Sequence, residues 1–391
     1  MRSYLSLILV LCLLMMSVAC TQTPAAPADD FSDTPLPADL PVPSRENPFF
    51  LQPYNDLRPF CQKYCGYKGY IVGADQFDSQ DLHTFSFPSD TIFIGAEALT
   101  QEILEAGMDP GLGIRVLHDQ GITGKGVNVA IIDQKLLPDH PEYAHAIAAY
   151  YETDTNAQFD EGSMHGPAVL SLLAGKNCGT APEAKVWFAA GFTGELDATD
   201  PAEALWWIIE QNRALPEGEK IRVVSVSAGP QEGYFAHAEL WTEAVSVAQS
   251  EGILVIDCRE IRDTGFVHSA YYDRSAPDDP EKSTPGYPND TDISLYLDDY
   301  FDGMVFAPAS FRTFAQTFEE GEYFYKYMGA GGQSWAVPYV AGVLALGFQV
   351  NPNLDSAAMK SLLFDSCVLH ETGRPMLDPT KFIQLVKATL P

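Results

Sequence analysis

The stretch Gly-Gln-Ser-Trp-Ala-Val-Pro-Tyr-Val-Ala-Gly at 332–342 places a serine just ahead of a run of small and apolar residues. Such a run predicts a buried helix that starts at Ser334. The first N–H groups of a helix lack internal partners, so a negative oxygen beside Ser334 would be stabilised there. Pro338 is expected to be tolerated because the first turn needs few internal hydrogen bonds. A lone serine at a helix start is usually a plain N-cap, so the inference depends on partners elsewhere.

Two upstream segments supply candidate partners for Ser334. An apolar, strand-like run at 127–132 ends at Asp133, and His165 opens a segment of small and apolar residues. A serine hydroxyl is a weak nucleophile, so an imidazole must accept its proton and a carboxylate must orient that imidazole. The order Asp, His, Ser along the chain is the order found in subtilisin. Asp133, His165 and Ser334 are therefore the candidate catalytic residues.

From about residue 121 to its C-terminus, the chain resembles the subtilisin-like serine peptidases, the subtilases. Asp133 and His165 are 32 residues apart, which is similar to the smaller members of the family. Ser227, Ala228 and Gly229 resemble the loop that forms one wall of the substrate cleft. Further similar segments lie in the expected order at 179–184, 307–308 and 351–354. The resemblance implies that 227–229 pair with an extended substrate backbone, as a strand edge does.

The motifs also depart from the usual pattern of the family. Gln134 and Lys135 follow the aspartate where Thr-Gly or Ser-Gly is usual, and Pro167 stands in the histidine motif. The strand-like run at 252–257 normally leads to an asparagine whose side chain donates to the oxyanion, and no asparagine follows here. Loss of one such donor costs roughly 100- to 1,000-fold in turnover. Arg259, Arg262 or the region of Cys258 could take over this role, so the second donor stays open.

Apolar and helical segments alternate through the chain, which predicts an α/β fold. The resemblance implies a subtilisin-like three-layer fold, with a mostly parallel central sheet covered by helices on both faces. Strands are expected at 127–132, 185–190, 221–225 and 253–257, and helices at 96–107, 114–120, 202–213 and 240–250. Catalytic side chains then gather at the carboxyl ends of the strands. At 318–322 an ordinary solvated turn is favoured, and a hairpin tip near the cleft is the alternative.

The composition limits the classes of partner. The 391 residues include 53 acidic and 23 basic ones, which gives a net charge of −30. A polyanion would be repelled, so nucleic acid and anionic membrane surfaces are not expected as principal partners. The expected partner is a protein or peptide substrate, and the oligomeric state stays open.

The N-terminus is typical of an exported lipoprotein. Residues 1–19 read as a signal peptide, and Cys20 follows small residues as a lipidated cysteine does. The segment 20–48 then reads as the lipidated cysteine with a disordered tether, which predicts an anchor on the outer face of the cytoplasmic membrane. Plain secretion with a different cleavage site is the alternative. The segment 49–90 has no assigned role, and the peptidase domain is expected over 91–391.

Two features admit a metal or a disulfide. Outside the signal region there are five cysteines at 61, 65, 178, 258 and 367, so at least one stays without a partner in the chain. No second pair with zinc-like spacing accompanies Cys61 and Cys65. The acidic stretch 271–302 could hold calcium, although charged loops are usually only solvated. We expect no cofactor, with calcium as the alternative.

The pattern favours a serine endopeptidase that hydrolyses peptide bonds through an acyl-enzyme. Ser334 would attack the carbonyl, His165 would transfer the proton, and Asp133 would orient His165. The backbone N–H of Ser334 would supply one oxyanion donor. The alternative is a catalytically decayed protein of the same fold that binds peptides or a protein partner. Amidase or esterase action by the same triad also stays open.

Overall fold

The computed structural model describes residues 50–58, 69–290 and 292–391. The predicted signal peptide, the tether with Cys20, and both Cys61 and Cys65 lie outside these ranges. Within them, no helix has both the length and the apolar character that crossing a membrane requires.

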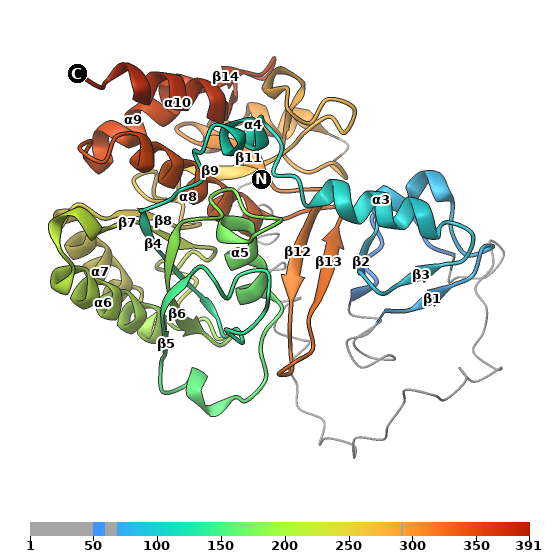
Figure 1. Cartoon of the computed structure of the whole chain (residues 1–391), viewed down its shortest axis with the longest axis horizontal. Coiled ribbons are helices and arrows are strands. Elements are labelled where there is room, and N and C mark those ends of the chain that lie inside the picture. Colours follow the sequence, from blue (N-terminus) through green and yellow to red (C-terminus); the bar gives the residue numbers. More distant parts are fainter. Residues whose placement is uncertain (1–49, 59–68, 291) are drawn as a thin grey trace.

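A parallel sheet of five strands forms the centre of the molecule (Figure 1). Its strand order is β5-β6-β4-β7-β8, and every neighbouring pair is parallel. The strands are β4 (Asn128–Gln134), β5 (Ile147–Glu152), β6 (Lys185–Phe192), β7 (Ile221–Val226) and β8 (Leu254–Ile256). The four strands expected from the sequence are therefore all present, and β5 is an additional one.

Helices cover both faces of this sheet, because alternate residues of each strand point to opposite sides. Val129 and Ile131 of β4 pack in the same cluster as α5 (His165–Ala174) and α8 (Gln333–Val350). Ala130 and Ile132 pack in the other cluster. That cluster holds residues of α6 (Thr199–Ala214) and α7 (Ala238–Ser250). The three-layer α/β fold that the sequence predicted is confirmed.

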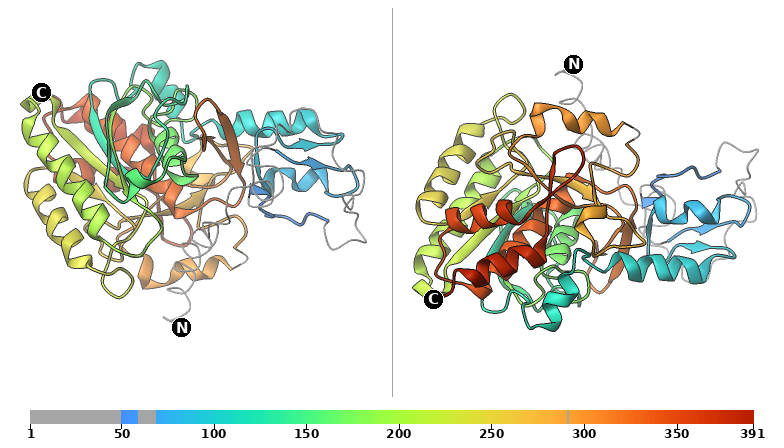
Figure 2. Two further views of the ribbon diagram at one scale, coloured as in Figure 1. Left: turned by 90° about the horizontal axis from the view of Figure 1, so that it is seen from below. Right: turned by 90° about the horizontal axis from the view of Figure 1, so that it is seen from above.

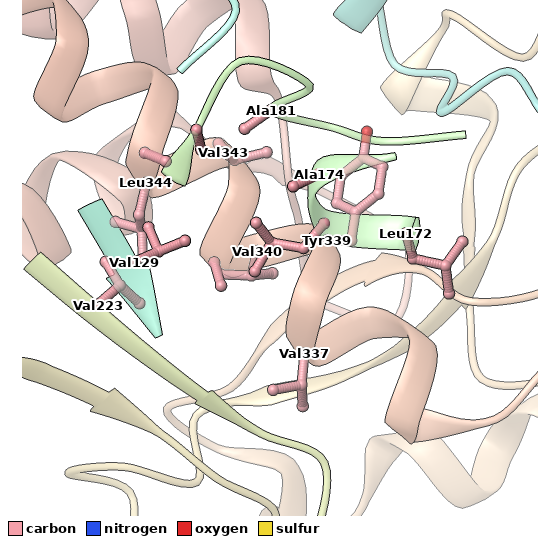
Figure 3. Packing of buried hydrophobic residues seen from close by; sticks show 14 of the residues in the cluster. Val129, Leu172, Ala174, Ala181, Val223, Val337, Tyr339, Val340, Val343 and Leu344 are labelled. Carbon is pink, nitrogen blue, oxygen red and sulfur yellow. The ribbon is translucent and has the colours of Figure 1, made fainter. Parts of the chain in front are cut away.

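Helix α8 runs through the interior rather than over the surface. Every residue from Trp335 to Phe348 is buried, so this helix needs no polar face. Figure 3 shows its apolar side chains against Val129 of β4, Val223 of β7 and Leu172 of α5. This packing fixes the start of α8, and with it Ser334, relative to β4 and α5, which carry the other two candidate catalytic residues.

The chain before residue 108 forms an N-terminal module, which we define as residues 50–58 and 69–107. It projects to one side of the main body (Figure 2). Its elements are β1 (Ile71–Val72), β2 (Ser86–Pro88), β3 (Ile92–Phe93) and α3 (Glu97–Gly107).

Aromatic side chains fill the N-terminal module and join it to the main body. A cluster that includes Phe85, Phe87 and Phe93 also holds Leu104 of α3 and Tyr327 of the main body. The pair β1–β3 and this cluster include residues from both sides of position 90. The packing therefore joins residues on both sides of position 90, and the boundary of the peptidase domain stays a prediction.

A hairpin links the N-terminal module to the main body. Its strands are β12 (Arg312–Gln316) and β13 (Phe324–Met328), and β2 pairs with β13 as a third antiparallel strand. The segment 318–322 therefore lies at the tip of this hairpin. In Figure 1 this hairpin stands between the module and α5.

A second five-stranded sheet and three helices complete the fold. The sheet has the order β10-β9-β11-β15-β14. Its strands are β9 (Val267–Tyr271), β10 (Thr284–Pro285), β11 (Val305–Pro308), β14 (Val368–Leu369) and β15 (Pro375–Met376). The helices are α4 (Ile114–Asp119), α9 (Ser356–Ser366) and α10 (Pro379–Ala388). Short 3-10 helices lie at Ser79–Thr84, Asn156–Gln158, Glu217–Glu219, Pro280–Lys282, Ile293–Leu297 and Asp299–Phe301.

Candidate active site

Asp133 and His165 meet at the carboxyl edge of the central sheet. Asp133 is the second-last residue of β4, and His165 is the first residue of α5. The Nδ1 atom of His165 lies 2.7 Å from Oδ1 of Asp133, and both residues are at most 5% exposed. The same oxygen accepts a hydrogen bond from the backbone N–H of Gln134 at 2.8 Å. These two contacts fix the carboxylate, and the carboxylate orients the imidazole.

The approach of α5 to β4 depends on the glycine after the histidine. A Cβ atom at Gly166 would lie 2.1 Å from the carbonyl oxygen of Gln134, which no side chain tolerates. This position therefore requires glycine, because the helix starts directly against the end of the strand. The glycine that follows His165 in the sequence therefore allows α5 to pack closely against β4, and this packing brings His165 to Asp133.

Ser334 lies at the start of α8, beside the end of β7. It is the second residue of the helix, and Gly332 before it offers no side-chain cap. Its Oγ donates to the backbone carbonyl of Ser227 at 3.4 Å, while Ser227 Oγ donates to the carbonyl of Ser334 at 2.8 Å. Among the described residues, no hydrogen bond joins Ser334 to His165. In this arrangement the hydroxyl points to β7.

Trp335 connects the serine helix to the histidine. Its ring centroid lies 5.0 Å from that of His165, with the planes tilted by 33°. The indole is 1% exposed and packs on Phe314 of β12 at 4.9 Å. Trp335 therefore supports the imidazole from the side of α8, next to Ser334. The sequence pattern predicted no role for this residue, although its place directly after Ser334 was the available signal.

The loop after β8 carries a buried ion pair where an oxyanion donor was expected. Arg259 Nε donates to Asp257 Oδ2 at 2.6 Å, and Arg259 Nη2 donates to Thr264 at 2.9 Å. Trp241 Nε1 also donates to Asp257, at 3.2 Å. Burial raises the pKa of the Asp257 carboxyl, and the charge of Arg259 together with hydrogen bonds from Thr264 and Arg259 opposes that rise. Arg259 is 3% exposed, and its guanidinium forms an ion pair with Asp257.

The guanidinium of the second alternative, Arg262, is also held by other groups. The guanidinium of Arg262 donates to the carbonyls of Asp302, Gly265 and Tyr300. The thiol of Cys258 has a raised pKa because of burial, with the charges of Asp257 and Asp133 adding to the effect. The guanidinium groups of Arg259 and Arg262 are therefore both occupied by other partners, and the region of Cys258 stays an open alternative for the second donor. Cys258 is one of three free cysteines in the described ranges, with Cys178 and Cys367.

The expected substrate wall follows β7 directly. The carbonyl of Ala228 accepts from the backbone N–H of Cys258 at 2.8 Å, so this loop is held by the chain that follows β8. A Cβ atom at Gly229 would lie 2.8 Å from the carbonyl oxygen of Cys258. The two loops therefore pack backbone to backbone beside Ser227 and Ser334. Pairing of residues 227–229 with a substrate stays a prediction.

The acidic stretch 271–302 uses its carboxylates to hold its own turns. Asp290 accepts from Tyr296 at 2.6 Å, Asp298 accepts from the N–H of Tyr300 at 2.8 Å, and Asp292 accepts from Ser294. Arg374 pairs with Asp302 at 2.7 Å. In the ranges that the structure describes, no three acidic, histidine or cysteine side chains converge as metal ligands. Calcium in this stretch stays an untested alternative.

The N-terminal module reaches the candidate site through Arg58. Its guanidinium forms an ion pair with Asp56 at 2.6 Å, and Nη1 lies 3.7 Å from the sulfur of Met164. Met164 directly precedes His165, so Arg58 contacts the residue next to the histidine. The sequence alone assigned no role to this segment, because the contact joins residues 106 positions apart.

Part of the chain is similar in sequence to known proteins. Residues 124–291 match the family described as the Subtilase family. Over this range, which is less than half of its length, the chain is similar to the subtilases. It is 25% identical to the subtilisin-like protease PopC of Myxococcus xanthus over 309 residues, which cover 67% of this chain and 61% of PopC. It is 30% identical to subtilisin E of Bacillus subtilis over 142 residues, which cover 33% of this chain and 34% of that protein. The chain thus spans less than two thirds of these subtilases.

Solved structures of the same fold cover more of the chain. The prenylagaramide maturation protease PagA matches with a TM-score of 0.52 and 18% identity, over 71% of this chain and 99% of PagA. The subtilase cytotoxin SubAB matches with a TM-score of 0.53 and 18% identity, over 71% of this chain and 95% of that chain. At this identity the likeness establishes the fold alone.

Proposed function

We propose that this subtilase relative is a serine endopeptidase with Asp133, His165 and Ser334 as its catalytic residues. The observation that carries the proposal is the buried 2.7 Å contact between Asp133 and His165 beside the start of α8. Family relationship supports a peptide or protein as the substrate. Residues 227–229 would bind its backbone.

The reaction would proceed through an acyl-enzyme. Ser334 Oγ turns from Ser227 to His165, attacks the carbonyl carbon of the peptide bond and passes its proton to His165. The carbonyl oxygen becomes an oxyanion near the backbone N–H of Ser334 at the start of α8. Collapse of this intermediate breaks the C–N bond, and His165 returns the proton to the leaving amine. Water then hydrolyses the ester by the same steps.

A second candidate is a decayed site that only binds a peptide or a protein. The hydrogen bond of Ser334 to Ser227, together with the buried Asp257–Arg259 pair in the oxyanion loop, favours this candidate. Amidase or esterase activity of the same triad would also follow from the same chemistry.

Labelling with a fluorophosphonate probe separates these candidates. The purified protein without residues 1–19 should react, and both Ser334→Ala and His165→Ala should abolish the reaction. Folding of each variant is checked by its melting temperature. A folded wild-type protein that does not react would exclude an activated serine and favour the binding protein. Peptide and ester substrates then distinguish peptidase from esterase activity.

For the cellular location, we propose export and anchoring through a lipid on Cys20. The resemblance of residues 1–20 to a lipoprotein leader supports this proposal. Mass spectrometry of the mature protein should find acyl chains on Cys20. A Cys20→Ser variant should move from the membrane fraction to the medium, and an unchanged distribution would contradict the anchor.

A further inference from the structure

The candidate site lacks a side-chain donor for the oxyanion in its usual place. The backbone N–H of Ser334 provides one donor, but a developing oxyanion is normally held by at least two. In the loop after β8, Arg259 is bound to Asp257 and Arg262 is bound to backbone carbonyls, so neither guanidinium is available as the second donor. A side chain from another element that borders Ser334 can take this role.

We propose that the side-chain amide of Gln333 is this second oxyanion donor, an inference that rests on the proposed function. Gln333 is the first residue of α8 and directly precedes Ser334. It is half-buried, so a bound substrate can still reach it. Its Nε2 donates to the backbone carbonyl of Val267 at 2.9 Å.

The contact with Val267 holds the amide in place. Val267 is the first residue of β9 and is fully buried, so its carbonyl is a rigid anchor. A primary amide carries two N–H donors, and only one of them is used by Val267. No other hydrogen bond to this amide exists among the residues that the structure describes. The second N–H is therefore free to donate, and its nitrogen is already fixed, which is the condition for electrostatic preorganisation.

The start of α8 leaves the neighbouring backbone donors available as well. No side chain caps this helix, because its N-cap is Gly332. The N–H of Ser334 and the Gln333 amide thus belong to adjacent residues at the positive end of the same helix. Together they form a pair of donors that requires nothing from the loop after β8.

The fluorophosphonate reaction reports on this pair. Ser334 Oγ forms a bond to phosphorus, the P–F bond breaks and fluoride leaves, while the proton of Ser334 passes to His165. The phosphoryl oxygen gains negative charge in this step, as a peptide oxyanion would. Donors at that position therefore raise the maximal rate of labelling, kinact, more than they change the probe affinity, KI.

The test compares three glutamine variants by kinact and KI. Gln333→Met removes the donors at nearly constant size, and Gln333→Glu replaces the amide with a negative charge. Both should lower kinact about 100- to 1,000-fold, with KI and melting temperature nearly unchanged. Gln231→Met is the matched control, since Gln231 is a glutamine of the loop after β7 whose side chain accepts from the backbone N–H of Glu260. This control should label as wild type does.

The outcomes separate the inference from the proposed function. If either Gln333 variant folds and labels at the wild-type rate while Ser334→Ala does not label, Gln333 is not a donor and the serine peptidase stands. If Gln333→Met alone unfolds, the Gln333→Glu variant decides. If folded wild-type protein does not label, both the inference and the proposed function are overturned.

Discussion

The hydroxyl of Ser227 donates to the carbonyl oxygen of Ser334 at 2.8 Å. In an α-helix this carbonyl would accept from the N–H four residues later, but residue 338 is proline and has no N–H. Ser227 therefore supplies the donor that Pro338 lacks. Pro338 is the sixth residue of α8 and so lies beyond the first turn. The helix accommodates this proline because Ser227 supplies the missing donor, and the expectation that the first turn alone would accommodate it is wrong.

This relationship predicts that Ser227→Ala and Pro338→Ala are coupled. Ser227→Ala leaves the carbonyl of Ser334 without a donor, which should cost about 1–2 kcal/mol of unfolding free energy. In the Pro338→Ala background the new backbone N–H at position 338 can replace it, so the same change should cost less. Urea denaturation of the four proteins gives the coupling energy. Equal costs in the two backgrounds would show that the hydroxyl does not replace the proline donor.

Asp133→Asn tests the part of the proposed triad that is best defined by geometry. The carboxylate accepts from both His165 and the N–H of Gln134, so an amide at this position favours the wrong tautomer of His165. We expect fluorophosphonate labelling to slow by about 10,000-fold with little change in melting temperature. Asp139→Asn is the control, since Asp139 is exposed and accepts from Tyr323 on the hairpin side. A fast-labelling Asp133→Asn variant would remove Asp133 from the mechanism.

Removing one partner of the buried Asp257–Arg259 pair should lower the unfolding free energy more than removing the charges of both partners. Arg259→Met leaves the carboxylate of Asp257, which is 0% exposed, without its cation. This should cost about 3–5 kcal/mol of unfolding free energy. Adding Asp257→Asn removes the buried charge and should restore part of the loss. Chemical denaturation measures both steps, and a double variant less stable than Arg259→Met would contradict an ionised pair.

The sequence predicted the central fold well because its signals are local. The apolar runs of β4, β6 and β7 are those of strands buried on both faces, and the helices between them have matching lengths. The His-Gly and Ser-containing motifs also carry local packing requirements, as Gly166 shows. For this reason the meeting of Asp133 and His165 could be expected from the sequence alone.

The remaining features depend on contacts between distant residues. Ser227 supplies the hydrogen-bond donor that Pro338 lacks, and Arg259 binds Asp257 and Thr264. Both contacts depend on the directions of side chains, which a linear sequence pattern does not contain. The N-terminal module was unassigned for the same reason, since β2 pairs with β13 more than 230 residues later. Its short strands carry too few residues for a periodic signal.

Phe87 should report whether the N-terminal module unfolds together with the main body. Its ring is 0% exposed and packs on Phe93 at 5.1 Å and on Tyr327 of β13 at 5.4 Å. Phe87→Ala should cost about 3–5 kcal/mol and lower the temperature of a single unfolding transition. Ile71→Ala, at an exposed site of β1, should change stability by less than about 0.5 kcal/mol. A separate early transition in Phe87→Ala would show that the module unfolds on its own.

His268 should make the protein less stable in mild acid. Burial among Tyr296, Phe301 and Phe306 lowers the pKa of His268 to about 4, and Arg262 adds to this effect. The unfolded chain takes up a proton near pH 6.5, whereas the folded protein does so only near pH 4. Stability is therefore complete above about pH 6.5 and falls by roughly 3 kcal/mol as the pH drops to about 4. His268→Phe should flatten this dependence in urea denaturation across that range, while His145→Gln at an exposed site should not. An equally steep loss in His268→Phe would assign the acid sensitivity to other groups.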